Sequence, residues 1–236
     1  MSPVQPLMAT HEVTFPITDE AGILKLRAGD EVIVQGHIIG IRDRTQIRIF
    51  DEGIEPPMDL RGAFLLHTAP NVRRREDQGA ARGADPQELR ASPAVPSEMA
   101  GRLAPNPAIS TTKYDPVCIG TTTSARMVRF TEPLGARYGV RGICGKGGFP
   151  DEAIEPMRRH GMVYFAIVGG AAALETTQIE EIEEVAWEEL MPECLWKFRV
   201  KDFGPLTVGI DAHGNSLYHD VQSAAQKKLE ELYARL

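Results

Sequence analysis

The sequence predicts a mixed fold of the α/β or α+β class. Short apolar stretches with the two-residue alternation of β-strands recur along the chain, and segments with the charge pattern and spacing of helices lie between them. The chain has 236 residues, of which 42% are hydrophobic and 25% charged, so it can bury a real core. Without internal repeats, it is expected to form a single domain over residues 1–236, interrupted by an insertion at 71–113.

The N-terminal part is expected to supply strands. Residues 12–41 carry apolar side chains at strand-like spacing, and Ala28-Gly29-Asp30 is a turn signal within them. Residues 42–53 have the composition of a short helix, and residues 60–67 (LRGAFLLH) have that of a buried strand.

The segment 71–113 differs from the rest of the chain. It contains no aromatic residue, is dominated by Arg, Ala, Pro and Glu, and has five prolines between positions 86 and 107. Such a segment cannot bury enough apolar surface to offset its chain entropy. We therefore expect a long and largely disordered insertion.

The remaining elements follow the insertion. The charges and final glycine of 151–161 predict a helix, which Pro156 is expected to shorten or kink. The C-terminal residues 221–236 predict an amphipathic helix that packs on the core, and the acidic run 179–184 predicts a solvated surface. Strands are expected at 140–144, 162–170 and 195–203, a helix start at 120–127, a short helix at 171–177, and a hairpin over 205–220 with its turn at 212–215.

Composition excludes several classes of function. A net charge of −7 argues against general nucleic-acid binding, which requires a basic face. No apolar run approaches the roughly 20 residues of a membrane helix, so no membrane partner is expected. The first residues lack a basic stretch followed by an apolar one, and the expected location is therefore the cytoplasm.

The cysteines do not form a recognisable metal motif. Cys118, Cys144 and Cys194 are widely spaced and odd in number, which disfavours a disulfide framework. An iron–sulfur cluster takes three or four thiolates from its protein, usually closely spaced. We expect this chain to provide no metal ligand.

Three short motifs are candidates for a binding site. The run GICGKGGF (142–149) lacks the spacing of a phosphate-binding loop and leaves Lys146 on a glycine-rich turn, where it is either an anion ligand or an exposed lysine. The hydroxyl-rich loop before Arg126 fits either a carboxylate site or an ordinary helix N-cap. Arg42-Asp43, at the end of a strand, fits either a binding site or a structural ion pair.

Together and in this order, the three motifs resemble a known family. The chain resembles the C-terminal domain of class I fumarases and the β subunits of two-subunit fumarases and tartrate dehydratases over residues 12–70 and 115–220. The matching segments are GDEV (29–32), Arg42-Asp43, GTTTSARM (120–127), GKG (145–147), YFAIVGGAAAL (164–174), ECLWK (193–197) with VKDF (200–203), and Asp211 to Asn215.

The resemblance implies a fold and a function. The fold is a swivelling β/β/α layered domain, and the activity is the reversible hydration or dehydration of a dicarboxylic 2-hydroxy acid, of the fumarate/malate or tartrate type. The chain would be a β subunit that is active only with an α subunit, in an expected α₂β₂ complex. The α subunit would carry the [4Fe-4S] cluster. Thr122 is implied as the catalytic residue, and Arg42, Arg126, Lys146 and Thr123 as substrate-binding residues.

Departures from the family pattern keep alternatives open. Gln46 stands where the family usually has histidine, and Thr121 where it has proline. These differences and the insertion favour a second hypothesis, a non-catalytic carboxylate-binding or regulatory subunit that keeps the fold. A stand-alone enzyme without a cluster is a third hypothesis, which the lack of cysteine ligands disfavours.

Overall fold

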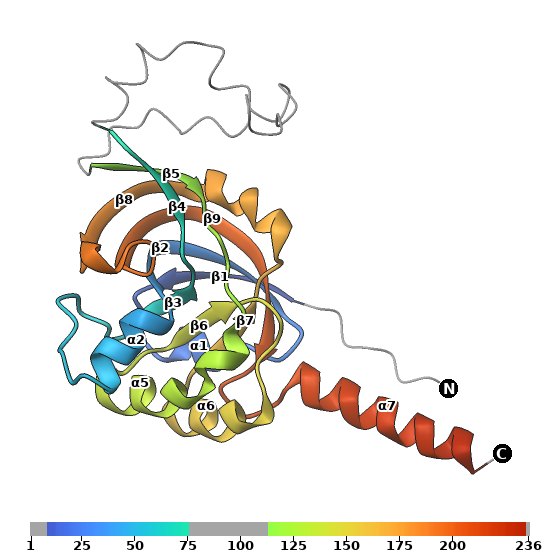
Figure 1. Cartoon of the computed structure of the whole chain (residues 1–236). Coiled ribbons are helices and arrows are strands. Elements are labelled where there is room, and N and C mark those ends of the chain that lie inside the picture. Colours follow the sequence, from blue (N-terminus) through green and yellow to red (C-terminus); the bar gives the residue numbers. More distant parts are fainter. Residues whose placement is uncertain (1–8, 76–112, 235–236) are drawn as a thin grey trace.

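The computed structural model describes residues 9–75 and 113–234 (Figure 1). It confirms the predicted mixture of strands and helices. The strands are β1 (Thr10–Phe15), β2 (Glu31–Ile41), β3 (Phe64–His67), β4 (Asn71–Arg74), β5 (Tyr114–Cys118), β6 (Gly142–Gly145), β7 (Val163–Ala166), β8 (Ile179–Ala186) and β9 (Leu195–Ile210). The α-helices are α1 (Ala21–Leu24), α2 (Asp43–Phe50), α5 (Thr131–Tyr138), α6 (Ile154–His160) and α7 (Leu217–Tyr233). The 3₁₀ helices are η3 (Ser124–Phe130), η4 (Asp151–Ala153), η5 (Gly170–Ala173), η6 (Glu175–Gln178) and η7 (Glu188–Leu190).

The main sheet closes on itself. Strands β1, β2, β3, β6 and β7 lie next to one another in that order and all run parallel. The long strand β9 pairs antiparallel with β7 on one side and with β2 on the other, and β8 pairs with β9. Because β9 pairs with β7 at one end of the parallel set and with β2 near the other, the strands curve into the barrel-like shape visible in Figure 1.

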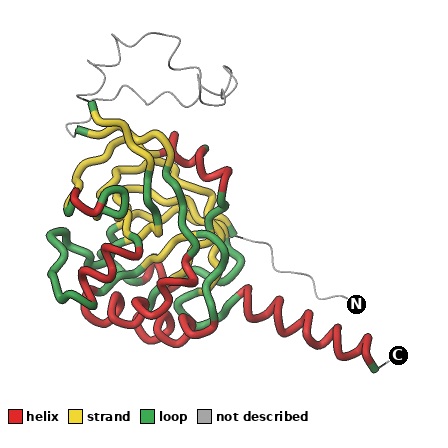
Figure 2. Tube along the Cα trace, viewed as in Figure 1, coloured by secondary structure: helices red, strands yellow, loops and turns green. Residues whose placement is uncertain are grey.

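Two hydrophobic clusters follow from the alternation of side chains along the strands. In β3, Phe64 and Leu66 point into the cluster inside the curved sheet, and Leu65 points into the cluster beneath the helices. Each of these fully buried side chains stabilises the fold by about 1.5–3 kcal/mol relative to an exposed position. Figure 2 shows α2, α5 and α6 on one side of the strands, and loops connect the ends of the strands to these helices.

Glycines end two of the helices, and the sequence predicts one of them, Gly161. Gly139 after α5 and Gly161 after α6 both have left-handed backbone angles, with φ of 66° and 60°. The helix predicted at 151–161 forms as η4 followed by α6. Pro156 is the third residue of α6, where its missing N–H would have no helical partner in any case.

The predicted insertion begins later than expected. Residues 71–74 form β4, which pairs antiparallel with β5 on the far side of the insertion. Val72 packs against the inner cluster, which explains why the segment is ordered although its composition is polar. The rest of the predicted insertion, 76–112, lies outside the described residues.

Three other predictions of local structure are wrong. Residues 21–24 form the helical turn α1 between β1 and β2 instead of a strand, and the Asp19 carboxylate accepts a hydrogen bond from Ala21 N at its start. Of the hairpin predicted over 205–220, only the turn forms: Asp211 N donates to the Asn215 carbonyl, and Ile210 and Ser216 make a single antiparallel bridge. The second strand is replaced by α7, which Ser216 caps, its hydroxyl accepting a hydrogen bond from His219 N. The C-terminal helix forms but does not pack on the core, because every side chain from 219 to 234 is exposed.

Candidate functional site

The carboxyl ends of the parallel strands bring the candidate residues to one edge of the sheet. Arg42 follows β2, His67 ends β3, and Lys146 follows β6. These three strands are adjacent and parallel, so their last residues lie side by side. In parallel sheets this edge is where ligands commonly bind, because the loops there converge around an open crevice.

The loop that carries Thr122 is fixed between two of these strand ends. Thr122 N donates to the carbonyl of His67 at 2.8 Å, and Lys146 N donates to the carbonyl of Thr122 at 3.1 Å. Ser124 N then donates to the carbonyl of Lys146 at 3.1 Å, and Thr123 forms a parallel bridge with Lys146. The structure therefore brings Thr122, Thr123 and Lys146 together through their main chains.

Lys146 is placed by the glycines around it. A Cβ added at Gly147, whose φ is +79°, would meet Thr123, and one at Gly169 would meet the aliphatic stem of Lys146 at 3.6 Å. These glycines let the loops approach closely. Within residues 9–75 and 113–234, the Lys146 ammonium makes no hydrogen bond or ion pair, and the lysine is only partly buried. It is a cation available for an anionic ligand.

Asp43 joins the two candidate arginines. Arg126 Nη2 donates to Asp43 Oδ2 at 2.7 Å, and Arg42 Nε donates to the same oxygen at 3.2 Å. Burial alone would raise the pKa of Asp43, but the hydrogen bonds and charge of Arg126, helped by Arg42, outweigh it and hold the pKa below its ordinary value. The carboxylate is thus charged and orients both guanidinium groups. The sequence left two interpretations of Arg42-Asp43 open. In the structure the two residues form an ion pair, and through Asp43 they also contact Arg126.

Both arginines remain accessible. The side chain of Arg126 is 50% exposed and that of Arg42 is 29% exposed, so each can also reach a ligand. Arg42 also lies 3.6 Å from Glu193 Oε1. The local charge near the strand ends is therefore partly balanced before any ligand arrives.

His67 is a member of this region that the sequence motifs do not reveal. It is 1% exposed, and its Nδ1 lies 2.9 Å from Ser124 Oγ, which also lies 3.1 Å from the buried Tyr164 hydroxyl. Burial lowers the pKa of His67 to about 3, with Asp43 opposing and Arg126 adding to the effect, so the imidazole is neutral. Its only sequence signal is a histidine that ends the apolar run 63–67.

Gln46 does not face a ligand. It is fully buried, and its side-chain amide donates to Met127 Sδ at 2.9 Å. Its Oε1 and the Nε2 of His67 are buried without a hydrogen-bond partner among the described residues. The departure from the family pattern at position 46 thus lies beneath α2 and η3 and does not alter the exposed part of the site.

Two of the three cysteines lie in surroundings that favour the neutral thiol. Burial raises the pKa of the Cys144 thiol well above its ordinary value and raises that of Cys194 to about 11, which disfavours the thiolates that iron requires. In the described part of the chain, no group of three or more His, Cys, Asp or Glu residues could hold a metal ion. None of the helices there is long and apolar enough to cross a membrane.

Comparisons with known proteins place the chain in a family. A family model described as the fumarase C-terminus matches residues 105–221. The β subunit of L(+)-tartrate dehydratase from Escherichia coli K12 is 34% identical over 206 residues, which cover 87% of this chain and 85% of that protein. A putative β subunit of L(+)-tartrate dehydratase from Methanocaldococcus jannaschii is 30% identical over 226 residues, which cover 94% of this chain and 98% of that protein. A putative class I fumarate hydratase from Geobacillus stearothermophilus is 30% identical over 92% of this chain, which corresponds to 35% of that longer protein.

Proposed function

This chain belongs to the fumarase C-terminal family that includes the tartrate dehydratase β subunits, and on that premise we propose that it is the β subunit of a hydro-lyase acting on a dicarboxylic 2-hydroxy acid. The reaction is the reversible removal of water to give an unsaturated dicarboxylate. The observation that carries the proposal is the convergence of Arg42, Arg126 and Lys146 with Thr122 at adjacent strand ends.

Three cations suit a substrate with two carboxylates. The planar guanidinium groups of Arg42 and Arg126 can each bind a carboxylate through two parallel hydrogen bonds. Asp43 holds the two groups in position, and a substrate carboxylate would share or replace its hydrogen bonds. Lys146 adds a point charge at the end of β6, with β3 between it and β2, and its main chain bridges that of Thr123. This set favours a small dianion.

The chemistry assigns a role to Thr122. Elimination of water requires removal of a proton from the carbon next to a carboxylate, and negative charge then develops on that carboxylate. Lys146 and the arginines would stabilise the charge where it appears. Thr122 would accept the proton, and because a neutral hydroxyl is a weak base, its own proton must be drawn away by another group. His67 is neutral, and its carbonyl fixes the Thr122 amide.

We place the iron–sulfur cluster on an α partner, since two of the three cysteines here favour the neutral thiol. When bound, the cluster would act as a Lewis acid for the leaving hydroxyl. The partner would cover the strand-end edge, where Val168 and Leu174 are 54% and 59% exposed. Covering these residues would also exclude water from Lys146. We also propose that this layered domain swivels against the partner. The complex would be an α₂β₂ assembly located in the cytoplasm.

The proposal is tested by turnover in the assembled complex. The chain is co-expressed under anaerobic conditions with a cysteine-bearing α subunit, the cluster is reconstituted, and fumarate, malate, the tartrates and mesaconate are screened. We expect one of these dicarboxylates to be hydrated or dehydrated. An assembled complex with an intact cluster that turns over none of them, but binds a dicarboxylate, would support the non-catalytic alternative instead.

A further inference from the structure

Three buried polar side chains link the loop that carries Thr122 to two strands. His67 at the end of β3, Ser124 in the loop and Tyr164 in β7 are each at most 1% exposed. His67 Nδ1 lies 2.9 Å from Ser124 Oγ, which lies 3.1 Å from the Tyr164 hydroxyl. That hydroxyl lies 2.8 Å from the Gly145 carbonyl. We call the three side chains the buried polar chain; the function proposed above uses only the main chain of His67.

The hydrogens of the buried polar chain can be assigned by elimination. Burial raises the pKa of Tyr164 well above its ordinary value and lowers the pKa of His67 to about 3, so the phenol is protonated and the imidazole is neutral. Each of the three groups therefore has one hydrogen to donate. Because a carbonyl oxygen only accepts, the hydrogen of Tyr164 goes to Gly145. Ser124 then donates to Tyr164, and His67 Nδ1 donates to Ser124.

This assignment fixes the tautomer of His67. With the hydrogen on Nδ1, the other ring nitrogen, Nε2, carries a lone pair, and it is buried without a hydrogen-bond partner among residues 9–75 and 113–234. The opposite tautomer would leave one of the three contacts of the buried polar chain without a hydrogen. The contact of His67 with Ser124 is therefore made by a donor on the ring.

His67 holds the Thr122 loop at two points. Its carbonyl accepts from Thr122 N at 2.8 Å, and its ring donates to Ser124, two residues further along the loop. On the opposite side, Lys146 N donates to the Thr122 carbonyl at 3.1 Å, and Ser124 N donates to the Lys146 carbonyl at 3.1 Å. The backbone on either side of Thr122 is thus fixed relative to both strand ends.

We propose that His67 is a positioning residue, which acts through Ser124 as the Nδ1–H tautomer and sets Thr122 for removal of the substrate proton. The inference rests on the proposed function, because it requires Thr122 to act on the substrate. His67 is too deeply buried to touch the substrate, and the accessible arginines bind the carboxylates. Loss of the buried polar chain should therefore lower kcat and leave KM nearly unchanged.

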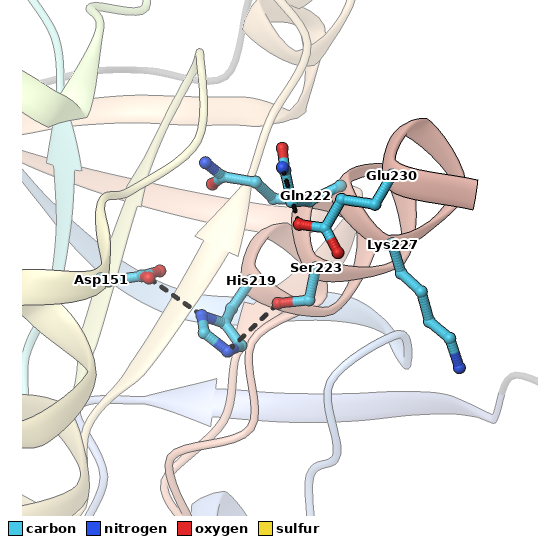
Figure 3. A pocket seen from close by; sticks show the side chains of 7 residues that line it. Asp151, His219, Gln222, Ser223, Lys227 and Glu230 are labelled. Carbon is cyan, nitrogen blue, oxygen red and sulfur yellow. Dashed lines mark hydrogen bonds and ion pairs between the residues drawn. The ribbon is translucent and has the colours of Figure 1, made fainter. Parts of the chain in front are cut away.

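The first measurement reads the tautomer in the full chain alone and needs no turnover. Nitrogen-15 NMR of the histidine-labelled chain distinguishes the two ring nitrogens, and the signals of His67 are those missing from His67→Asn. We expect a protonated Nδ1 in the unmodified chain and a shift toward the Nε2–H form in Ser124→Ala. Ser223→Ala is the matched control, because Ser223 Oγ lies 3.5 Å from Nε2 of the exposed His219 (Figure 3). This control should leave the tautomer of His67 unchanged.

The second measurement separates kcat from KM in the reconstituted complex. Ser124→Ala should lower kcat about tenfold or more and change KM less than about twofold, because the loop shifts while the arginines stay in place. His67→Leu should have the same effect. His67→Asn should recover most of the kcat, because the asparagine amide offers an N–H near the position of Nδ1. Thr131→Val removes a buried hydroxyl that has no partner in the described part of the chain, and it should leave both constants unchanged.

Three results would overturn the inference. One is an Nε2–H tautomer of His67 in the unmodified chain. Another is a Ser124→Ala complex with the same kcat as Thr131→Val. The third is an equal kcat for His67→Asn and His67→Leu. If Thr122→Val abolishes turnover while Ser124→Ala retains it, only this inference fails, whereas an active Thr122→Val complex would overturn the proposed role of Thr122 as well.

Discussion

Asp43 is the residue that turns two separate arginines into one binding element. Its carboxylate accepts from Arg126 and Arg42, and its lowered pKa keeps it charged throughout the neutral range. A guanidinium held in this way loses little further freedom when it binds a carboxylate, because its plane is already set. The positions of the donors, and not only their charge, should therefore determine affinity.

Replacement of Arg126 by lysine tests this point. Arg126→Lys keeps the charge but loses the planar pair of donors, so we expect KM for the dicarboxylate to rise about tenfold or more in the assembled enzyme. Arg129→Lys is the matched control. It lies on the same 3₁₀ helix, is similarly exposed, and pairs with Asp51 away from the site. Equal KM values for the two variants would contradict the role of Arg126.

His67 makes the folded chain sensitive to acid. Burial lowers the pKa of His67 to about 3 in the folded chain, whereas in the unfolded chain the pKa returns to its ordinary value of about 6.5, so the unfolded chain binds protons more tightly. The stabilisation is fully present above pH 6.5 and is lost as the pH falls toward 3. Between pH 7 and pH 5 this one group should cost about 2 kcal/mol.

The measurement is the free energy of unfolding by denaturant at pH 7 and pH 5. His67→Asn removes the titrating group and keeps a polar side chain beside Ser124. We expect the variant to lose less stability than the unmodified chain over this interval. An identical loss in both proteins would mean that His67 is not a buried neutral imidazole.

The sequence predicts the candidate residues better than the contacts between them. Arg42, Thr122, Arg126 and Lys146 are candidates because of their order within matched segments. The structure places Arg42 and Lys146 after β2 and β6, Thr122 in the loop beside them and Arg126 on η3. The bridging by Asp43 and the burial of His67 depend on tertiary packing across about 60–85 residues of chain. No local pattern reports such contacts.

At the scale of the elements, the junction of β6 with the loop 120–124 leaves no room for an added side chain. Gly145 ends β6, and a Cβ added there would lie closer than 3.0 Å to Ser124 Oγ and at 3.0 Å from the Thr122 carbonyl. Tyr164 also donates its hydroxyl to the Gly145 carbonyl at 2.8 Å. The glycine is required by the close approach of two backbones.

Gly145→Ala should therefore destabilise the fold and displace Thr122. Overpacking of a tight contact costs about 1–3 kcal/mol, which lowers the melting temperature of a chain of this size by several degrees. Turnover should fall further than stability explains. Gly22→Ala is the control, because a Cβ at Gly22 in α1 meets nothing within 4 Å. The measurements are thermal unfolding and kcat/KM, and equal values for both variants would exclude the tight junction.

The elements that the sequence failed to predict share a cause. Strand β8 has isoleucines three residues apart, at 179 and 182, yet both are buried because bulges shift its register against β9. The apolar alternation around 205–210 belongs to β9, and the following turn leads into α7 because Asp211 accepts hydrogen bonds from the amides of His213 and Asn215. Register and turn direction are set by neighbouring strands, which a single sequence does not display.

At the scale of the whole molecule, β9 lies within the sheet, whereas α7 extends away from it. Strand β9 pairs with both β2 and β7 and so fixes the strand ends that carry the candidate site. Helix α7 leaves the body just after β9, and its side chains from 219 to 234 are exposed.

The catalytic role of Thr122 is tested most directly by removing only its hydroxyl. In the reconstituted complex, Thr122→Val keeps the shape of the side chain, and Thr122→Ser keeps the hydroxyl. We predict that the valine variant loses about 10²–10⁴-fold in kcat with the cluster's electron paramagnetic resonance signal unchanged, and that the serine variant retains measurable turnover. A valine variant that turns over the substrate at the unmodified rate would contradict the account.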